Sequence, residues 1–220
     1  MIAVTPTRGD RGQLLEQCKK YVERQTHKVQ EHIIIDYPPT GKQKDITPRF
    51  RDGINQAISK GADIIVFMED DDWYHPNYIK QMLAGWNSVG RPACFGIGFT
   101  YYYHIGTRAW TTMRHPQRAS AFCTMLTATA INNFKWPSDS DPFLDVHLWK
   151  KIPGGRTIMP QPLIALGIKH GIGLSGGMGH NKKWRAYTNT DLSMSWLRGV
   201  VGEEDFKFYQ QLANEVRNRL

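Results

Sequence analysis

The stretch DIIVFMEDDDWYHP, residues 63–76, joins an apolar run to four consecutive acidic side chains. Residues 63–68 are expected to form a strand, because a run this apolar is typical of strands buried on both faces of a parallel sheet. Glu69 to Asp72 follow directly, and carboxylates this close repel one another unless a cation screens them. Hard oxygen ligands on a short loop suit Mg²⁺ or Mn²⁺. A second interpretation assigns one carboxylate to a helix cap and leaves the others in solvent.

An alternation of strand and helix patterns surrounds this stretch. Residues 2–5 and 32–36 are short apolar runs, which predict strands. Residues 11–25, 47–60 and 75–88 have the apolar spacing of helices. This order predicts an α/β fold with a Rossmann-like, mostly parallel central sheet flanked by helices. Ligands of such sheets bind beyond the carboxyl ends of the strands, and the acidic cluster follows one of those ends.

Local signals predict where these helices begin and end. Asp10 stands where the N-cap of the first helix is expected, and Thr47 followed by Pro48 indicates the start of the second. Gly61 is expected to end that second helix, because glycine readily adopts the left-handed conformation found after helix C-termini.

The second half of the chain has a different pattern. Aromatic and β-branched residues with turn signals predict antiparallel strands over residues 93–115, and strand alternation places about half of those rings on a core. Other segments are expected as strand then helix (119–131), helix capped by Asp141 with Pro142 in its first turn (141–152), extended chain (157–170) and helix (203–220). No linker divides the chain, so we expect one domain over residues 1–220.

Composition limits the classes of protein to which the chain could belong. The formal charge of +8 and the isoelectric point of about 9.4 indicate either a soluble basic surface or a polyanionic partner. Three widely spaced cysteines, Cys18, Cys94 and Cys123, predict free thiols in a reducing compartment, and hence a cytoplasmic protein. No apolar run approaches the roughly 20 residues of a membrane helix, and the N-terminus lacks the pattern of a signal peptide.

Four motifs occur in an order that resembles a known family. They are VTPTRGDR (4–11), IIID (33–36), RFRDGINQAISKGAD (49–63) and EDDDW (69–73). In this order they resemble the nucleotide-binding half of glycosyltransferases with a GT-A fold, most closely those of family 2. The resemblance covers more than a third of the chain. It implies that residues 1–90 bind a nucleotide sugar and that residues 91–220, with a smaller antiparallel elaboration, bind the acceptor.

The resemblance assigns roles to residues of the first half. Pro6, Thr7, Arg8, Asp36 and Arg51 would contact the nucleotide sugar, with Asp36 at the base. Glu69 or Asp70 would lie nearer the ribose, and Asp71 and Asp72 would bind Mn²⁺ or Mg²⁺.

Two departures from the family pattern affect these assignments. Glu69 replaces the usual first aspartate, so either Glu69 with Asp71 or Asp70 with Asp72 forms the spaced pair. Asp52 replaces the asparagine that usually follows the basic residue.

Inverting members of this family use a carboxylate as general base at the start of a helix in the second half. DPFLDVHLWKK (141–151) resembles that segment, and Asp145 is our candidate for the base. Asp141 precedes a proline and is expected to be a cap, and Asp139 is a weaker candidate. Acidic residues are also common in first helical turns for electrostatic reasons alone, which is the competing interpretation of Asp145.

The glycine-rich segment 171–190 carries the remaining candidates. Its GIGLSG does not indicate a dinucleotide site, because no apolar helical pattern follows it. His180 resembles the third metal ligand of many GT-A enzymes, with His170 as the alternative. Lys182 and Trp184, with Lys183, Arg185 and Tyr187 nearby, are expected to contact the donor phosphates or a polyanionic acceptor. A solvated basic turn is the simpler interpretation of this segment.

These observations favour a metal-dependent glycosyltransferase that moves a sugar from a nucleotide-sugar donor, expected to be UDP-linked, to an acceptor hydroxyl. The charge suggests a nucleic-acid acceptor, such as a hydroxymethylated base in viral DNA, and a glycan or lipid-linked acceptor is the alternative. A nucleotidyltransferase is a second hypothesis, although TPTRGDRG (5–12) has few glycines for its phosphate loop. A third is a nucleic-acid-binding module without catalysis, which the acidic motif disfavours.

Overall fold

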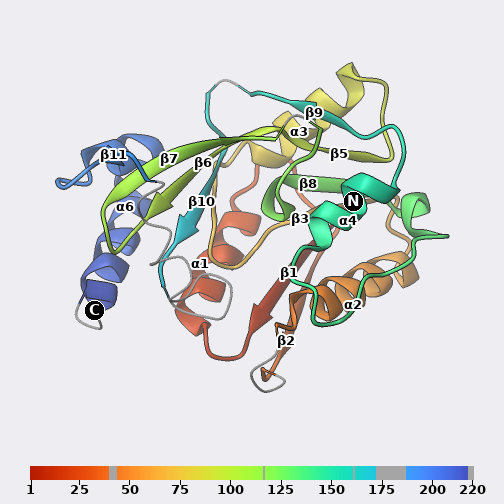
Figure 1. Ribbon diagram of the computed structural model, residues 1–220, viewed down its shortest axis with the longest axis horizontal. Coiled ribbons are helices and arrows are strands. Elements are labelled where there is room, and N and C mark those ends of the chain that lie inside the picture. Colours follow the sequence, from red (N-terminus) through yellow and green to blue (C-terminus); the bar gives the residue numbers. More distant parts are fainter. Residues whose placement is uncertain (40–43, 116, 161, 172–186, 218–220) are drawn as a thin grey trace.

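The computed structural model covers residues 1–220 and describes all of them except 40–43, 116, 161, 172–186 and 218–220. Figure 1 shows two sheets and the helices packed around them. This is the mixed α/β architecture that the sequence predicts.

The larger sheet contains the three strands that were expected in the first half. Its strand order is β2 (Glu31–Tyr37), β1 (Ile2–Arg8), β3 (Ile64–Phe67), β8 (Thr124–Thr127), β5 (Cys94–Ile97) and β9 (Arg156–Ile158). β1 is parallel to both β2 and β3, and β5 is parallel to β9, whereas β8 is antiparallel to both its neighbours. The expected mostly parallel sheet is therefore confirmed.

The smaller sheet comes mainly from the second half. Its order is β11 (Asn189–Thr190), β7 (Ala109–Arg114), β6 (Phe99–His104), β10 (Ala165–Lys169) and β4 (Trp73–Tyr74). β6 and β7 pair antiparallel, which confirms the expected elaboration. The short strand β4 follows the acidic cluster and pairs with β10, so residues 69–72 lie where the two sheets meet.

The helices begin and end close to the expected positions, except that α6 begins at Ser195, whereas the last helix was expected only from residue 203. They are α1 (Gly12–Glu23), α2 (Ile46–Ser59), α3 (Tyr78–Ser88), α4 (Leu144–Lys151) and α6 (Ser195–Arg217), with 3-10 turns η1 (Ala121–Cys123) and η2 (Ala128–Ile131). α6 is interrupted at Gly202, whose φ of 80° is left-handed. Gly61 follows α2 with a φ of 77°, as the helix-end signal predicts.

The predictions of helix N-caps were wrong for the first two helices. Arg11 occupies the N-cap position of α1, and the carboxylate of Asp10 instead pairs with Arg8 at 3.0 Å. α2 begins one residue before Thr47, whose hydroxyl donates to the backbone oxygen of Asp141. A different local partner thus replaced the expected cap bond at Asp10, and a tertiary partner replaced it at Thr47.

The start of α4 also differs from the prediction. Asp141 accepts the N–H of Phe143 at 2.9 Å, and the helix begins only at Leu144, so Pro142 precedes the first turn instead of occupying it. This shift leaves Asp145 in the first turn of the helix.

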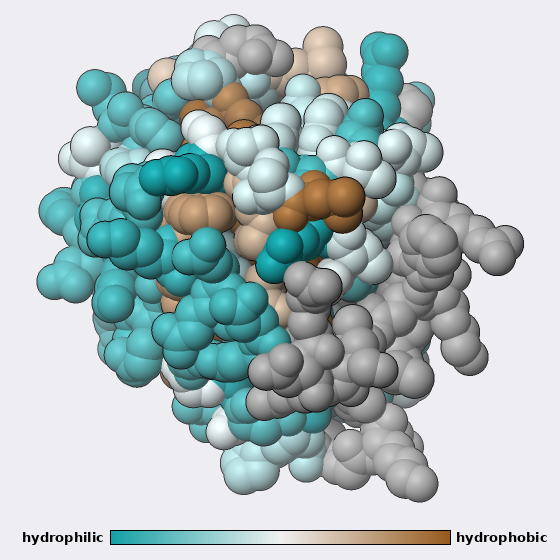
Figure 2. Space-filling model, turned by 90° about the vertical axis from the view of Figure 1, so that its left-hand side faces the viewer, coloured by the Kyte–Doolittle hydropathy of each residue, from teal (hydrophilic) through white to brown (hydrophobic). Residues whose placement is uncertain are grey.

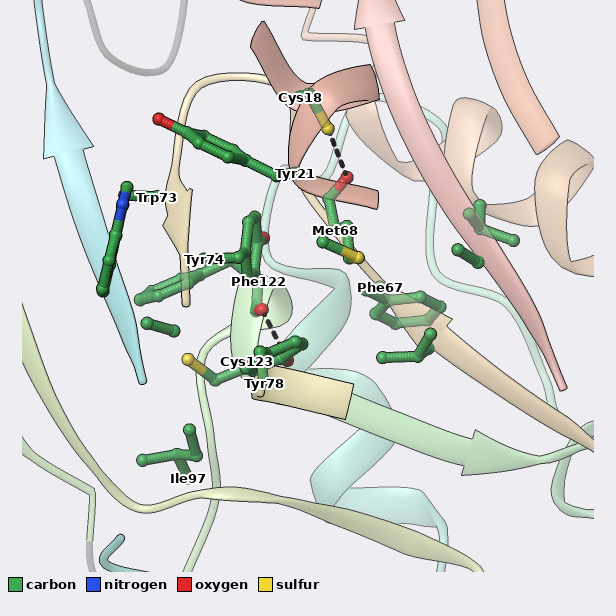
Figure 3. Close-up of a cluster of buried hydrophobic side chains, with 14 of the residues drawn as sticks. Cys18, Tyr21, Phe67, Met68, Trp73, Tyr74, Tyr78, Ile97, Phe122 and Cys123 are labelled. Atoms are coloured by element: carbon green, nitrogen blue, oxygen red, sulfur yellow. Dashed lines mark hydrogen bonds between the residues drawn. The ribbon is translucent and has the colours of Figure 1, made fainter. Parts of the chain in front are cut away.

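The core continues beneath the acidic cluster. Figure 3 shows the buried side chains of Phe67, Met68, Trp73, Tyr74 and Tyr78 within one hydrophobic cluster. The hydroxyl of Tyr78 donates to the backbone oxygen of Phe122 at 3.1 Å. Burial of each such side chain contributes about 1.5–3 kcal/mol to stability. The buried side chains before and after the acidic cluster therefore fix the turn that contains it.

The cysteines and the surface agree with a globular protein. Cys18, Cys94 and Cys123 are all buried free thiols. The face in Figure 2 is mostly hydrophilic, with apolar residues confined to small areas. No helix in the described part of the chain combines the length and the apolar character needed to cross a membrane.

Candidate active site

The acidic cluster lies in the turn between β3 and β4, at the carboxyl end of β3. One oxygen from each of Glu69, Asp71 and Asp72 lies within 4.8 Å of the others. Asp70, Asp71 and Asp72 are buried, and Glu69 is partly exposed. Three carboxylates therefore converge on one small volume.

The end of β1 and the start of α1 contact the cluster from one side. The hydroxyl of Thr7 donates to Asp70 at 2.5 Å, and Arg11 donates to Asp70 at 3.0 Å and to Asp71 at 3.4 Å. Burial, together with the charge of Asp71, raises the pKa of Asp70 to about 6 although Arg11 and Thr7 act in the opposite direction. The carboxylate of Asp70 is thus already paired with two side chains of the protein, Thr7 and Arg11.

The end of β10 contacts the cluster from the other side. The N–H of Ile168 donates to Asp72 at 2.7 Å, and Nε2 of His170 lies 3.0 Å from a carboxylate oxygen of Asp71. Lys169 lies between Ile168 and His170 in the sequence, and the charges of Asp72 and Asp71 act on its ammonium group. Burial lowers the pKa of Lys169, but these carboxylates raise it more, so its pKa is above the ordinary value.

The carboxylates differ in their tendency to ionise. Burial, with Asp72 and Asp71 adding to it, raises the pKa of Glu69 well above its ordinary value. Burial also raises the pKa of Asp72 to about 8, although Lys169 lowers it. Burial also acts to raise the pKa of Asp71. The hydrogen bond from His170 and the charge of Arg11 outweigh burial there, so the pKa of Asp71 is lowered.

The cluster has the chemistry of a divalent cation site. Oδ2 of Asp72 is buried and has no hydrogen-bond partner within the described residues. Burial of an unpaired carboxylate oxygen is costly, and a cation would both pair with it and reduce the repulsion between the neighbouring carboxylates. A set of carboxylate oxygens fits Mg²⁺ or Mn²⁺.

A cavity of about 400 Å³ opens beside the cluster. Its lining includes Glu69 and Asp72 from the first half of the chain and Tyr102, Arg118, Asp145 and Lys169 from the second. Carboxylates that lie 73 or more positions apart in the sequence thus share one cavity.

Asp145 is the carboxylate of the second half that lines this cavity. It lies in the first turn of α4 and forms an ion pair with Arg118 at 2.5 Å. Burial raises the pKa of Asp145, and Arg118 lowers it in part.

The other two acidic candidates of this segment are engaged elsewhere. Asp139 is exposed and pairs with Arg51 at 2.6 Å, and Asp141 pairs with His147 at 2.8 Å. Neither residue is among those that line the cavity.

The residues predicted to bind the nucleotide converge in part. Thr7 and Asp36 are register partners at the carboxyl ends of β1 and β2, Arg8 follows Thr7, and Pro6 is buried within β1. Arg51 forms an ion pair with Asp139, and its charge also acts on Tyr37 at the end of β2.

The remaining predicted residues, His180, Lys182 and Trp184, lie outside the described residues. His170, the alternative third metal ligand, lies against Asp71 as described above.

Sequence reasoning missed Arg49, which is almost fully buried. Its guanidinium donates to the backbone oxygens of Thr7 and Tyr37 and to the carboxylate of Asp45, and it lies 3.9 Å from the centre of the Tyr37 ring. Arg49 therefore holds the ends of β1 and β2 together. Its helical spacing to Gly53 and Ala57, both buried, was the signal that it faces inward.

Arg11, Arg118 and Lys169 were missed as well. Each is brought to an acidic residue far away in the sequence, at separations of 59 for Arg11 and Asp70 and 27 for Arg118 and Asp145. No local pattern marks such residues.

Comparison with known proteins supports the fold. No protein-family model and no curated protein matches the sequence. Among solved structures, the chain is similar to S. aureus TarS 1–349 in complex with UDP-GlcNAc, with a TM-score of 0.57, 9% identity, and coverage of 76% of this chain and 58% of that chain. The same protein in complex with UDP gives a TM-score of 0.53, 10% identity, and coverage of 76% and 60%.

These similarities confirm the expected GT-A-like fold of glycosyltransferases. At this identity they show the fold alone. The chain spans less than two thirds of the length of the TarS chains that it matches.

Proposed function

We propose that this protein is a metal-dependent glycosyltransferase that moves a sugar from a UDP-linked donor to an acceptor hydroxyl. The observation that carries the proposal is one cavity lined both by the acidic cluster, through Glu69 and Asp72, and by Asp145. One set of carboxylates suits cation binding, and the separate carboxylate suits proton transfer. The similarity to a fold solved with UDP-GlcNAc supports the choice of donor.

The donor would bind at the carboxyl ends of β1, β2 and β3. Asp72, Glu69 and Asp71 would hold Mn²⁺ or Mg²⁺, which when bound neutralises the charge that develops on the diphosphate leaving group. Asp70 is already engaged by Thr7 and Arg11, so its role would be to fix the turn or to contact the ribose.

Asp145 would act as the general base. As the acceptor oxygen attacks the anomeric carbon, its proton passes to the Asp145 carboxylate. The bond from the anomeric carbon to the phosphate oxygen breaks at the same time, and the nucleoside diphosphate leaves with the electron pair. This single displacement inverts the configuration of the sugar.

The acceptor proposal rests on charge. A net charge of +8 favours a polyanionic acceptor, such as DNA with hydroxymethylated bases in a viral genome, and a glycan is the competing candidate. The three unpaired, buried thiols fit a reducing compartment such as the cytoplasm.

A thermal-shift panel tests the proposal. A ligand that binds the folded state raises the melting temperature, so UDP and UDP-GlcNAc should raise it with Mn²⁺ and not with EDTA. ADP, GDP and CDP serve as controls for the base. A Mn²⁺-dependent shift with ADP, GDP or CDP in place of UDP would assign a different nucleotide to the donor. No shift with any nucleoside diphosphate would contradict the proposed function. Release of pyrophosphate from a nucleoside triphosphate and a sugar phosphate would instead show a nucleotidyltransferase.

A further inference from the structure

Three successive residues at the end of β10 face the acidic cluster in different ways. Ile168 binds Asp72 through its N–H, and His170 contacts Asp71 through its ring. Lys169, between them, lines the cavity together with Glu69 and Asp72. Its ammonium lies 5.3 Å from the centre of the Tyr102 ring, on the cavity side of the smaller sheet.

Lys169 differs from Arg11, the other cation at the cluster. Arg11 is hydrogen-bonded to both Asp70 and Asp71. Lys169 interacts with Asp72, Asp71 and Glu69 through space, but in the described part of the chain no carboxylate oxygen lies within the 4.0 Å of an ion pair. Its charge therefore acts on the cluster without being committed to a single carboxylate.

We propose that Lys169 is a built-in cation of the donor site, which partly neutralises the acidic cluster when no metal is bound and donates to a diphosphate oxygen when the donor is bound. This inference rests on the proposed function and names a ligand class, a nucleoside diphosphate. A lysine ammonium suits this role because it is a compact charge with three donors on a flexible stem.

The two parts of this role predict effects of opposite sign. A positive charge beside Glu69 and Asp72 repels a divalent cation, so its removal should strengthen metal binding. The same charge attracts the diphosphate, and hydrogen bonds between charged groups are the stronger ones, so its removal should weaken nucleotide binding. A residue that only supports the fold would weaken both.

Titration calorimetry on the full chain tests the inference, with Mn²⁺ alone and then with UDP at saturating Mn²⁺. We expect Lys169→Met to lower the Kd of Mn²⁺ by about threefold or more and to raise the Kd of UDP by about tenfold or more. Lys169→Arg keeps the charge and should remain close to wild type in both. Lys80→Met, on the exposed face of α3, is the matched control and should change neither Kd.

The other outcomes distinguish failure of the role of Lys169 from failure of the proposed function. If UDP binds wild type and Lys169→Met equally well, or if Lys169→Met weakens Mn²⁺ binding, the role of Lys169 is refuted while the proposed function stands. If wild type binds Mn²⁺ but no nucleoside diphosphate, the proposed function and this inference both fail. If Lys169→Met unfolds, a loss of UDP affinity in Lys169→Gln together with tighter Mn²⁺ binding supports the inference, and unchanged affinities overturn it.

Discussion

Two acidic segments of this chain look alike in the sequence and differ in the fold. Residues 69–72 and residues 139–145 each supply several carboxylates within one short stretch. In the first, the three aspartates are buried and each has its own hydrogen-bond partner. In the second, Asp139 is exposed, Asp141 is partly exposed, and only Asp145 lines the cavity.

The difference follows from where each segment begins. A strand in the middle of a sheet ends among other strands, so carboxylates that follow it are enclosed by them. A loop that leads into a helix runs over the surface, and among the carboxylates of this loop and helix only Asp145, in the first helical turn, lines the cavity. The first segment is therefore suited to hold a cation, and the second presents one base.

The largest effect is expected from Asp72→Asn. This change removes the charge of the carboxylate that has the unpaired oxygen, so Mn²⁺ affinity and Mn²⁺-dependent UDP binding should fall by about 100-fold or more. Calorimetry with Mn²⁺ measures the effect, and circular dichroism checks the fold. Unchanged Mn²⁺ affinity would show that the first segment does not bind the metal.

Asp145→Asn should separate the catalytic role of the second segment from the metal-binding role of the first. Loss of a general base lowers kcat by about 10²–10⁴-fold, whereas binding of UDP with Mn²⁺ should stay at the wild-type level. The measurement is UDP release from UDP-GlcNAc, with water or a trial acceptor, beside calorimetry with UDP. Turnover equal to wild type would exclude Asp145 as the base.

Arg118→Gln should change the pH dependence of turnover. Burial raises the pKa of Asp145 and Arg118 lowers it, so loss of Arg118 raises this pKa further. Activity that needs ionised Asp145 is lost as the pH falls through its pKa, so the acidic limb of the kcat/KM profile should move to higher pH. Lower turnover with an unmoved limb would mean that Arg118 contacts the substrate or only supports the fold.

The metal-free protein should lose stability as the pH rises. Asp70 and Asp72 have pKa values of about 6 and about 8 in the folded protein, and unfolded aspartate titrates near pH 3.9. The unfolded chain releases these protons first, so the free energy of unfolding should fall between about pH 4 and pH 8. Urea unfolding in EDTA measures this fall. Asp72→Asn should flatten its upper part, and an equally steep fall in that variant would contradict the assignment.

The smallest effect is expected from Asp139→Asn. This carboxylate is exposed and its ion pair with Arg51 lies at the surface, where such pairs contribute little. Metal affinity, turnover and melting temperature should all remain at the wild-type level. A large loss of turnover would mean that the second segment contributes more than Asp145.

Much of the fold could be predicted because its signals are local. The apolar run 63–68, the helical spacing of 11–25 and the turn at Gly61 report on neighbouring residues, and the structure confirms them. The N-caps at Asp10 and Thr47 were also local predictions, and they failed because Asp10 pairs with its neighbour Arg8 and Thr47 with the distant backbone of Asp141.

The chain alone thus indicates a mostly parallel sheet with carboxylates at a strand end, since apolar periodicity and acidic clustering can be read along a sequence. It does not show which carboxylates share a cavity. Folding decided that Ile168 and His170 meet Asp72 and Asp71 across 96 and 99 positions, and that Asp145 lines the cavity beside them. Such contacts depend on how β10 and α4 pack against the first half, and no local pattern of residues encodes that packing.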